Sequence, residues 1–529
     1  MRSADNAIEA PGAIVLGAGI AGLFTALKLA PFPALVIASG KSGGSGSSVW
    51  AQGGIAAAAG ADDSWSLHAQ DTLGAAAGTG DAHVAEIVAR EAPQRIEDLV
   101  RLGAPFDRDS SGRLALAREA AHSRARIVHV SGDRAGAAIM ATLSKAAAST
   151  PSITIAEGFE ALELSMLDGR AIGLFARYGT GTNARLVLFR SRAIVFATGG
   201  VGALYAVTTN PLESRGQGLG IAARAGALVA DAEFVQFHPT AIDIGRDPAP
   251  LATEALRGDG AVLVDETGRR FMSAIHPARE LAPRDVVARA IHREIAYGRR
   301  VFLDCRCAIG DSFASRFPTV YAACMSGGID PAKAPIPVAP AAHYHMGGIA
   351  SDEHGRSSIP GLWCVGECAS TGLHGANRLA SNSLAEALVF AARAADNIKG
   401  ATAARSGEGR PPFAPALAPP APLQTLRRTM TSMVGVEREE TELQSALDTI
   451  QKLERASGGD PASLNVLAAA KLVAASALMR RESIGAHFRC DYPRRAADPE
   501  RSRFTLNEAE KIASEFAELP VRDGKRKLQ

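Results

Sequence analysis

The strongest constraint on the fold of this chain lies between residues 13 and 38. Ala13–Leu16 is a short, wholly apolar run that predicts a buried strand, and the sequence GAGIAG (Gly17–Gly22) follows it at once. Ile20–Leu29 then predicts a helix, and Ala34–Ala38 predicts a second strand. A G-x-G-x-x-G turn placed between a strand and a helix is typical of a βαβ unit that binds a dinucleotide.

Each glycine of this turn has its own expected task. We expect Gly17 to make the tight turn, Gly19 to let the backbone approach a pyrophosphate and Gly22 to let the helix pack on the sheet. The helix N-terminus would supply N–H donors and a positive dipole end. The second strand runs into SGK (residues 39–41), where an acidic residue usually holds the ribose. The fingerprint of a simple NAD site is therefore incomplete, and the ribose must be held in another way.

Further glycine-rich segments occur at distant places in the chain. The tract Lys41–Gly54 (KSGGSGSSVWAQGG) could be a flexible linker, but it lies inside the nucleotide-binding unit. We interpret it as a loop of small residues packed against a cofactor. Ala193–Gly200 and Gly361–Glu367 are strand-like runs with glycines at their ends, and Ser383–Asn397 predicts a following helix. Such strands predict one parallel sheet assembled from separate segments.

The order of the segments predicts the domain organisation. We expect a nucleotide-binding domain from residues 1–239 and 343–400, interrupted by an inserted domain over residues 240–342. Residues 401–422 hold six Pro between 411 and 422 and predict an extended linker. Residues 423–529 would form a small helical bundle.

Two stretches carry the prediction of this bundle. Leu423–Ala456 and Pro461–Arg481 are strongly helical in their pattern. The chain ends in the basic sequence RDGKRKLQ, which we expect to be a solvated tail. Earlier in the chain, Asp81–Leu102 predicts another helix, with Asp81 as its N-cap.

Composition excludes several classes of partner. Lys+Arg (57) and Asp+Glu (55) nearly balance, so the net charge of +2 gives no general attraction to nucleic acid or anionic lipid. Six Cys without metal-ligand or disulfide-framework spacing fit a reducing cytosol. Residues 1–11 contain no apolar core typical of a secretory signal. We expect a soluble, cytoplasmic protein with no membrane, metal or nucleic-acid partner.

Longer motifs carry a resemblance to a known family. AQGGIAA, FATGG, QFHPT, LRGDGA, ELAPRDVVARAI, AAHYHMGG, GLWCVGE and STGLHGANRLASNSL follow GAGIAG along the chain. In this order they resemble the flavoproteins of the succinate dehydrogenase/fumarate reductase family, over residues 12–400. The resemblance implies an α/β fold, in which a Rossmann-like FAD-binding domain is interrupted by an α+β capping domain and followed by a C-terminal helical bundle.

The resemblance also implies where FAD binds. Two side chains depart from the family pattern, and we assign neither to the cofactor: Gln217 stands where relatives often carry an acidic residue, and Lys41 is displaced by one position. The implied cofactor-binding residues are Gly17, Ala18, Gly19, Ile20, Ala21, Gly22, Ser47, Ser48, Val49, Trp50, Ala51, Gln52, Gly53, Gly54, Glu367, Ser383 and Leu384.

The implied substrate residues suit a molecule with two carboxylates. Arg offers a planar fork to a carboxylate, and His offers a directed N–H donor. Histidines on an apolar face are more often structural, and we keep that interpretation for His345 and His354. The family positions that would bind substrate are Glu119, His238, Thr253, Glu254, His343 and Arg378.

Arg284, in the sequence APRD, occupies the position of the family's proton-transfer arginine, so the resemblance implies a catalytic role. Free Arg has a pKa above about 12 and seldom gives up its proton. Two roles therefore stay open, a proton donor in fumarate reduction and an electrostatic clamp in amino-acid oxidation. The structural alternative is an ion pair with Asp285 at the start of a helix.

The sequences ESIGAH and DYP (Glu482–His487 and Asp491–Pro493) resemble the branch of the family that oxidises L-aspartate. Ile484 stands where that branch usually carries Arg, so any role of that Arg is absent.

The resemblance implies hydride transfer from Cα of L-aspartate to FAD, giving iminoaspartate, the first step of bacterial quinolinate and NAD synthesis. Electrons would pass to O2 or to fumarate. Iminoaspartate is unstable in water, so a transient contact with quinolinate synthase is expected.

Glu119 lies in a segment where the aspartate-oxidising branch carries Glu and the rest of the family usually carries an apolar residue. Aspartate differs from succinate by an ammonium group. A pocket of His and Arg repels that group unless an anion lies beside it, and Glu119 would supply the anion. The structural alternative is a surface ion pair with Arg118 or Arg124.

Two rival functions remain open. A soluble fumarate reductase or a succinate dehydrogenase flavoprotein subunit would share the motifs, and many such subunits bind FAD covalently through a His four residues before AQGG. That position is Ser47 here, so we expect dissociable FAD.

The second rival is a flavoprotein that acts with RNA. It would need a concentrated basic face, and the sequence has no long Lys/Arg run outside the short C-terminal tail.

Overall fold

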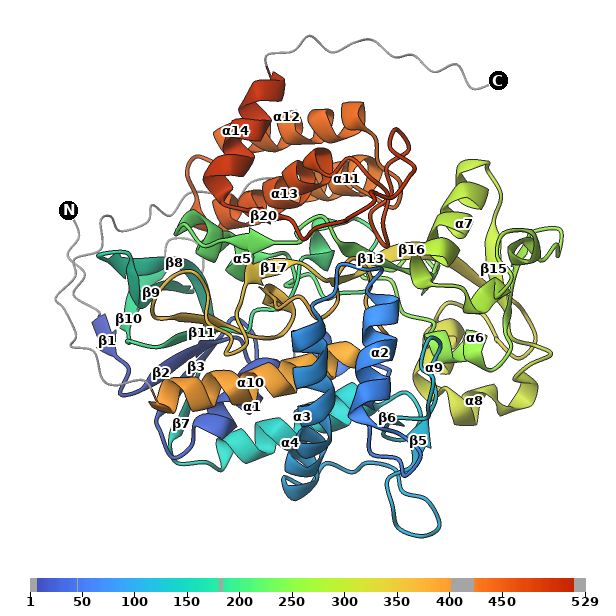
Figure 1. Ribbon diagram of the computed structural model, residues 1–529, viewed down its shortest axis with the longest axis horizontal. Coiled ribbons are helices and arrows are strands. Elements are labelled where there is room, and N and C mark those ends of the chain that lie inside the picture. Colours follow the sequence, from blue (N-terminus) through green and yellow to red (C-terminus); the bar gives the residue numbers. More distant parts are fainter. Residues whose placement is uncertain (1–6, 45, 180–183, 401–422, 518–529) are drawn as a thin grey trace.

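The computed structural model describes residues 7–44, 46–179, 184–400 and 423–517 (Figure 1). The predicted linker and the basic tail lie outside these residues. A five-stranded parallel sheet with the order β18-β11-β2-β3-β7 forms the centre, which confirms that strands from distant segments share one sheet. Its strands are β2 (Ala13–Leu16), β3 (Ala34–Ala38), β7 (Ile153–Glu157), β11 (Ile194–Phe196) and β18 (Leu362–Cys364).

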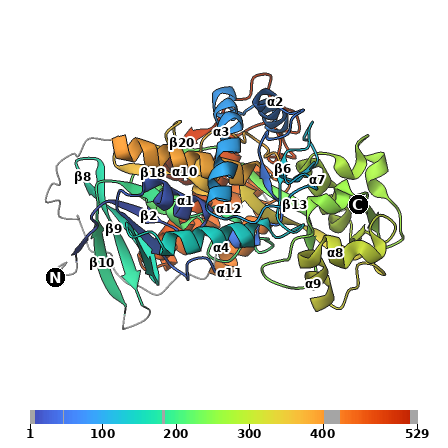
Figure 2. The same ribbon diagram turned by 90° about the horizontal axis from the view of Figure 1, so that it is seen from below.

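This sheet is buried on both faces, as its continuous apolar strands require. Ala13 and Val15 of β2 pack into one core with four helices, while Ile14 and Leu16 pack into a second core on the opposite face. Figure 2 shows helices α1, α3, α4 and α10 gathered beside the sheet. The helices of the first core are α1 (Ile20–Leu29), α3 (Ala82–Arg101), α4 (Ala135–Ala148) and α10 (Asn382–Gly400), with α2 (Trp65–Ala75) against α3.

A sheet with the order β1-β10-β9-β8 contributes to the second core, which also receives the C-terminal helices. Two smaller sheets have the orders β19-β17-β12-β20 and β4-β6-β5. The strands are β1 (Ala7–Glu9), β8 (Phe159–Leu167), β9 (Arg170–Tyr178), β10 (Arg185–Arg190), β12 (Val229–Ala230), β17 (Gly348–Ala350), β19 (Ala369–Ser370), β20 (Arg503–Phe504), β4 (Ile55–Ala56), β5 (Leu116–Ala117) and β6 (Ile127–Val128).

The capping module, seen on the right in Figure 1, has a hydrophobic core of its own, built from residues between Ile242 and Val338. Strands β13 (Val235–Ile242) and β16 (Ile336–His345) pair with each other and run across both predicted domain junctions. Both junctions therefore lie within the pairing of these two strands, here called the β13/β16 ribbon, which forms one side of a four-stranded sheet. The module also contains β14 (Val262–Asp265), β15 (Val301–Asp304), α6 (Glu254–Gly258), α7 (Arg284–Ala296), α8 (Phe313–Arg316) and α9 (Pro318–Ser326).

The C-terminal helices pack on the second core and complete the predicted fold class. The single helical stretch predicted over Leu423–Ala456 is wrong in one respect, because the helix stops at Met433 and restarts at Glu440. A Cβ atom at Gly435 would lie 2.4 Å from the Thr431 carbonyl oxygen, and Arg438 is buried there against the Glu233 carbonyl. The helices are α11 (Leu423–Met433), α12 (Glu440–Ala456), α13 (Pro461–Met479) and α14 (Leu506–Ala517), with α5 (Gln217–Arg224) against α13.

Helix α13 is the one helix, among the described residues, that is long and apolar enough to cross a membrane. Its apolar surface is used inside the protein, since 89% of the relevant window is buried. It is therefore the core helix of the C-terminal bundle.

Candidate active site

One large cavity of about 1080 Å³ brings the sequence-predicted residues together. It extends from the glycine turn after β2, past the loop of residues 46–54, to the β13/β16 ribbon. Every predicted cofactor and substrate residue lines it, with the exception of Gly22. The Cβ of an alanine at Gly22 would lie 1.9 Å from the Gly17 carbonyl oxygen, so Gly22 serves the packing of α1 on β2.

The glycine turn forms one end of the cavity. Gly17 has a φ of 111°, and a Cβ there would lie 2.2 Å from the Ala197 carbonyl oxygen, so only glycine fits. The backbone N–H of Ile20, in the first turn of α1, donates to Ser48 Oγ at 3.1 Å. The small-residue loop is thereby held against the helix N-terminus, which is where the sequence placed a cofactor.

Several polar side-chain atoms that line this cavity have no hydrogen-bond partner among the described residues. A buried polar group without a partner costs about 1–3 kcal/mol, so native proteins rarely leave several together. The atoms are Gln52 Oε1, Thr198 Oγ1, Asn210 Oδ1, both side-chain polar atoms of Gln217, and Arg378 Nε. A large bound group rich in oxygen and nitrogen would satisfy them, so the residues present fit FAD.

The structure adds Gln217, which the sequence left unassigned because it replaces an acidic residue. Gln217 begins α5 and lines the cavity, and both of its side-chain polar atoms lack a partner among the described residues. An amide can both donate and accept hydrogen bonds without carrying a charge. We therefore place Gln217 among the candidate cofactor contacts.

Three other predicted cofactor residues have partners within the protein. The Ser47 and Ser214 hydroxyl oxygens lie 3.0 Å apart, and Ser383 Oγ accepts from Arg378 Nη1 at 3.1 Å. Glu367 Oε1 accepts the backbone N–H of His345 at 2.9 Å. Burial raises the pKa of Glu367 to about 7.

Irregularities in the β13/β16 ribbon direct two histidines into the cavity. Gln236 pairs with Tyr344 and Phe237 pairs with Ala342, so His343 is an extra residue on its strand. Such a bulge redirects a side chain. A second shift follows His238, and the two imidazole rings lie 5.1 Å apart at this end of the cavity.

Both histidines are neutral donors rather than cations. Burial, with help from nearby Arg284, holds the pKa of His238 well below its usual value, and burial with Arg378 does the same for His343. The backbone N–H of Thr240 donates to His238 Nδ1 at 3.3 Å. A ring nitrogen that accepts carries no proton in the neutral ring, so Nε2 of His238 carries the N–H.

Arg284 and Arg378 converge on one amide oxygen. Gln236 Oε1 accepts from Arg284 Nη1 at 3.0 Å and from Arg378 Nη2 at 3.2 Å. Arg284 also pairs with Glu254 through its Nε. Burial would raise the pKa of Glu254, but Arg284 and Arg257 outweigh it and hold the pKa below its usual range. Glu254 is therefore an ionised partner for the clamp.

The structural alternative for Arg284 does not hold. Asp285 pairs instead with Arg289 at 2.8 Å, which leaves Arg284 to face the cavity. His345 fits its structural interpretation, because its Nε2 lies 3.0 Å from the Ala232 carbonyl oxygen. Thr253 precedes α6 and lines the cavity beside Glu254.

Arg378 is held on several sides. Its guanidinium lies over the ring of Tyr344, 4.6 Å from the ring centroid, in a cation–π contact. Burial and the nearby Arg284 lower the pKa of Arg378 to about 10. Arg378 stays charged at neutral pH, and an anion in the cavity would relieve the unfavourable environment.

Glu119 faces the cavity and makes no surface ion pair. Its Oε2 accepts from Ser381 Oγ at 2.8 Å, whereas Arg118 donates to the His122 carbonyl and Arg124 to the Asp62 carbonyl. Burial raises the pKa of Glu119, and the neighbouring Glu254 adds to this shift. The surface alternative for Glu119 is therefore wrong.

Gln236, Tyr344 and Ser381 were missed as site residues. All three lie inside motifs already recognised, QFHPT, AAHYHMGG and NRLASNSL, so the signal was present. Their contacts depend on strand register and loop packing, which those motifs do not display. Ile484 belongs to the same small buried cluster as Tyr344, so an apolar side chain at this position contributes to the packing around a site residue.

Comparisons with known proteins identify the family and the fold. A family model described as "FAD binding domain" matches residues 12–384, and one described as "Fumarate reductase flavoprotein C-term" matches residues 463–523. Among solved structures, E. coli quinol fumarate reductase FrdA aligns with a TM-score of 0.85 and 30% identity, covering 93% of each chain. Mycobacterium smegmatis Sdh1 aligns with a TM-score of 0.79 and 33% identity, covering 93% of this chain and 90% of that one.

Curated relatives narrow the family further. L-aspartate oxidase of Caulobacter vibrioides is 53% identical over 92% of this chain and 94% of its own length. L-aspartate oxidase of Bacillus subtilis is 41% identical over 90% of this chain and 91% of its own length. The chain therefore belongs to the L-aspartate oxidase family of FAD-binding flavoproteins.

Proposed function

We propose that this protein catalyses the FAD-dependent oxidation of L-aspartate to iminoaspartate. The observation that carries the proposal is the Glu119 carboxylate, which faces the cavity that Arg284, Arg378, His238 and His343 line. Glu254 in the same cavity pairs with Arg284, whereas Glu119 accepts its hydrogen bond from Ser381. A dicarboxylate substrate needs the positive groups, and only a substrate with an added ammonium needs the anion. The 53% identity to an L-aspartate oxidase supports the same conclusion.

The charge of each side chain indicates its role in binding the substrate. Arg378 and Arg284 supply the positive charge for two carboxylates, and His238 and His343 supply neutral N–H donors. Glu119 lies beside the substrate ammonium, which fixes the face of Cα that is presented for reaction. Glu254 holds Arg284 in place, so we assign Arg284 the role of electrostatic clamp.

FAD would be held by the glycine turn after β2, the loop of residues 47–54, Glu367 and the first residues of α10, with Gln217 as an added contact. When bound, FAD would supply the acceptor for the hydride that leaves the substrate Cα. Ser47 offers no imidazole for a covalent bond, so the cofactor is dissociable. The aspartate loses a hydride from Cα and a proton from its nitrogen, and a C=N bond forms.

The acceptor of the electrons is O2 or fumarate. Fumarate shares the two carboxylates of aspartate and lacks the ammonium, so the same arginines and histidines would bind it. This overlap, and the likeness to E. coli quinol fumarate reductase, favour fumarate reduction as a second activity of the same site. We place the enzyme in the cytoplasm, where it would pass unstable iminoaspartate to a quinolinate-forming enzyme.

An absorbance spectrum tests the proposal directly. Purified protein should show flavin bands, and anaerobic addition of L-aspartate should bleach them, with colour returning when air or fumarate is admitted. Succinate, added in a parallel cuvette, should bleach them far less. Bands that fade equally with succinate would replace the proposal with succinate dehydrogenation.

A further inference from the structure

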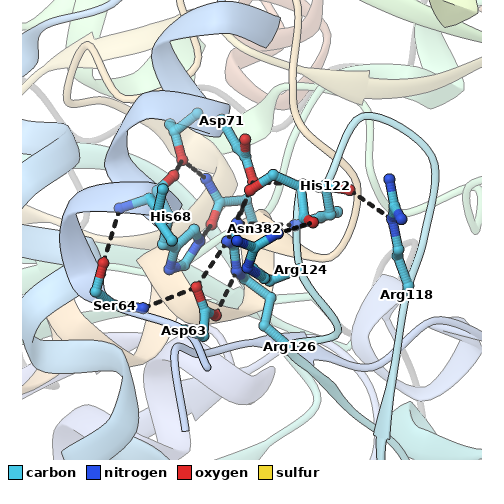
Figure 3. A network of polar contacts seen from close by, with 12 residues as sticks. Asp63, Ser64, His68, Asp71, Arg118, His122, Arg124, Arg126 and Asn382 are labelled. Atoms are coloured by element: carbon cyan, nitrogen blue, oxygen red, sulfur yellow. Dashed lines mark hydrogen bonds and ion pairs between the residues drawn. The ribbon is translucent and has the colours of Figure 1, made fainter. Parts of the chain in front are cut away.

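A polar cluster around Arg126 and His122 joins the loop of residues 118–126, which contains Glu119, to Asp63 and Asp71 (Figure 3). Arg126, whose side chain is fully buried, donates to both carboxylate oxygens of Asp63 at 2.8 and 3.0 Å and to Asp71 at 2.5 Å. The backbone N–H and hydroxyl of Ser123 both donate to the same Asp71 oxygen, at 2.7 and 2.8 Å. Two carboxylates thus fix residues 123–126 at the end of the loop that joins β5 to β6.

His122 joins this cluster to a second segment. Its Nε2 lies 3.0 Å from the Ala380 carbonyl oxygen, and its Nδ1 lies 3.3 Å from Arg126 Nη1. Arginine can only donate, so Nδ1 accepts and the proton resides on Nε2, which donates to Ala380. His122 is only 1% exposed, and burial lowers its pKa, so this neutral tautomer persists at neutral pH.

The residue after Ala380 is Ser381, which donates to Glu119. Asn382 is fixed as well, through hydrogen bonds with His68 at 2.9 Å and Thr72 at 3.0 Å. Both sides of the Glu119–Ser381 contact are therefore tied to one buried cluster.

Two residues at the Glu119–Ser381 contact have a strained backbone, one on each of the two segments that meet there. Ala121 has a φ of 66° and Ser381 has a φ of 58°, in the region that favours glycine. Such residues persist only where the surroundings over-determine them. The bond from His122 to Ala380 lies between these two strained positions and closes the loop onto the turn.

We propose that His122 is a positioning residue for amino-acid recognition, because its hydrogen bond to the Ala380 carbonyl holds the Glu119 loop against the Ser381 turn. Held there, the Glu119 carboxylate faces the substrate ammonium. The inference rests on the proposed function and assigns a residue that does not touch substrate to its specificity.

The test compares two variants of His122 with two substrates. His122→Leu removes the hydrogen bond and should raise KM for aspartate about tenfold, the effect expected from one lost hydrogen bond. Its kcat for aspartate and its kinetics of fumarate reduction should change little, because fumarate makes no use of Glu119. His122→Gln places an amide N–H near the position of Nε2 and should restore most of the affinity for aspartate.

A double-mutant cycle separates positioning from general support. In a Glu119→Gln background, which has already lost the carboxylate, His122→Leu should add no further rise in KM for aspartate. Additive losses, or equal losses for aspartate and fumarate, would overturn the proposal. Flavin content and the melting temperature are measured on every variant.

A second variant covers the case in which His122→Leu fails to fold. Ser123→Ala removes one hydrogen bond to Asp71 from the same loop and should raise KM for aspartate severalfold without affecting fumarate; an unchanged KM would count against the proposal. If the wild-type protein does not oxidise aspartate, that result would instead contradict the proposed function itself. If Glu119→Gln impairs aspartate selectively while His122→Leu does not, the inference alone fails.

Discussion

Arg378 is buried, stacked on Tyr344 and close to a second arginine, so its positive charge is unfavourable without an anion nearby. We expect it to fix a substrate carboxylate. Arg378→Leu should lower kcat/KM for aspartate roughly 10–100-fold, from the loss of one charge-assisted contact. Arg356→Leu, which removes an exposed arginine from a local turn with Asp352, is the matched control and should leave the kinetics unchanged. Normal kinetics of the Arg378 variant would show that this residue does not bind the substrate.

Ser47 determines how the flavin is retained. Its hydroxyl contacts Ser214, and no imidazole is present at this position to form a bond to the cofactor. Acid precipitation of the purified protein should therefore release all yellow colour into the supernatant. Colour that remains in the washed pellet would show a covalent link through another residue.

The raised pKa of Glu119 predicts how aspartate affinity depends on pH. As the pH falls through this pKa, Glu119 gains a proton and loses the charge that attracts the ammonium, so KM for aspartate should rise. Glu254, the other carboxylate facing this end, has a lowered pKa and stays ionised over that range. Steady-state kinetics against pH should show the rise in the wild type but not in Glu119→Gln, whose KM is high throughout. A parallel rise in both would assign the titration to another group.

Much of the candidate site was predictable from the resemblance to the flavoprotein family, because the motifs that carry it are long. Arg284, Arg378, His238 and His343 all reach one cavity, as the resemblance implied. The convergence of two arginines on Gln236 was not predictable, since it joins a residue of β13, the first residue of α7 and a loop residue before α10, which are up to 142 residues apart.

At the scale of elements, the close contact between β2 and α1 predicts a sharp difference between two Gly→Ala substitutions. Gly22→Ala would place a Cβ 1.9 Å from a backbone oxygen, which should destabilise the protein by about 1–3 kcal/mol and weaken FAD binding. Gly74→Ala, in helix α2 with nothing within 4 Å, should be neutral or stabilise by about 0.5–1 kcal/mol. Thermal melts and a flavin titration of both variants measure the difference. Equal melting temperatures would contradict it.

These elements also show how much of the secondary structure follows from the local sequence pattern. The strands of residues 13–16 and 34–38 and the helix of residues 20–29 appear with their predicted bounds, because each is defined by an apolar run and its flanking glycines. The break between α11 and α12 was missed, since it depends on Arg438 being anchored to the carbonyl of Glu233, some 200 residues earlier in the chain.

At the scale of the whole molecule, the carboxylate of Asp133 is one of the groups that join the FAD-binding domain to the capping module. Asp133 accepts the backbone N–H groups of Thr319 and Val320 at the start of α9, together with the Thr319 hydroxyl at 2.8 Å. The N-cap residue of α9 is Phe317, which cannot cap, so Asp133 performs the task from another domain.

Loss of this cap should loosen the contact between the two parts. Asp133→Ala should accelerate hydrogen exchange at the amides of Thr319 and Val320 and raise KM for aspartate about 2–30-fold, the range that follows from a cap worth about 0.5–2 kcal/mol. Asp109→Ala, in an exposed local turn, makes the same chemical change and should do neither. Unaltered protection of α9 in the Asp133 variant would refute the interdomain role.

The β13/β16 ribbon has a consequence for how the enzyme chooses its ligands. Arg284 begins α7 in the capping module and Arg378 belongs to the FAD-binding domain, yet both guanidinium groups reach the same amide oxygen. Like charges this close repel one another, and the Glu254 carboxylate forms its ion pair with Arg284 and not with Arg378. A dianion neutralises both arginines, whereas a molecule with one carboxylate leaves part of the repulsion in place. Electrostatics alone would therefore favour a dicarboxylic over a monocarboxylic amino acid, before any difference in steric contact is counted.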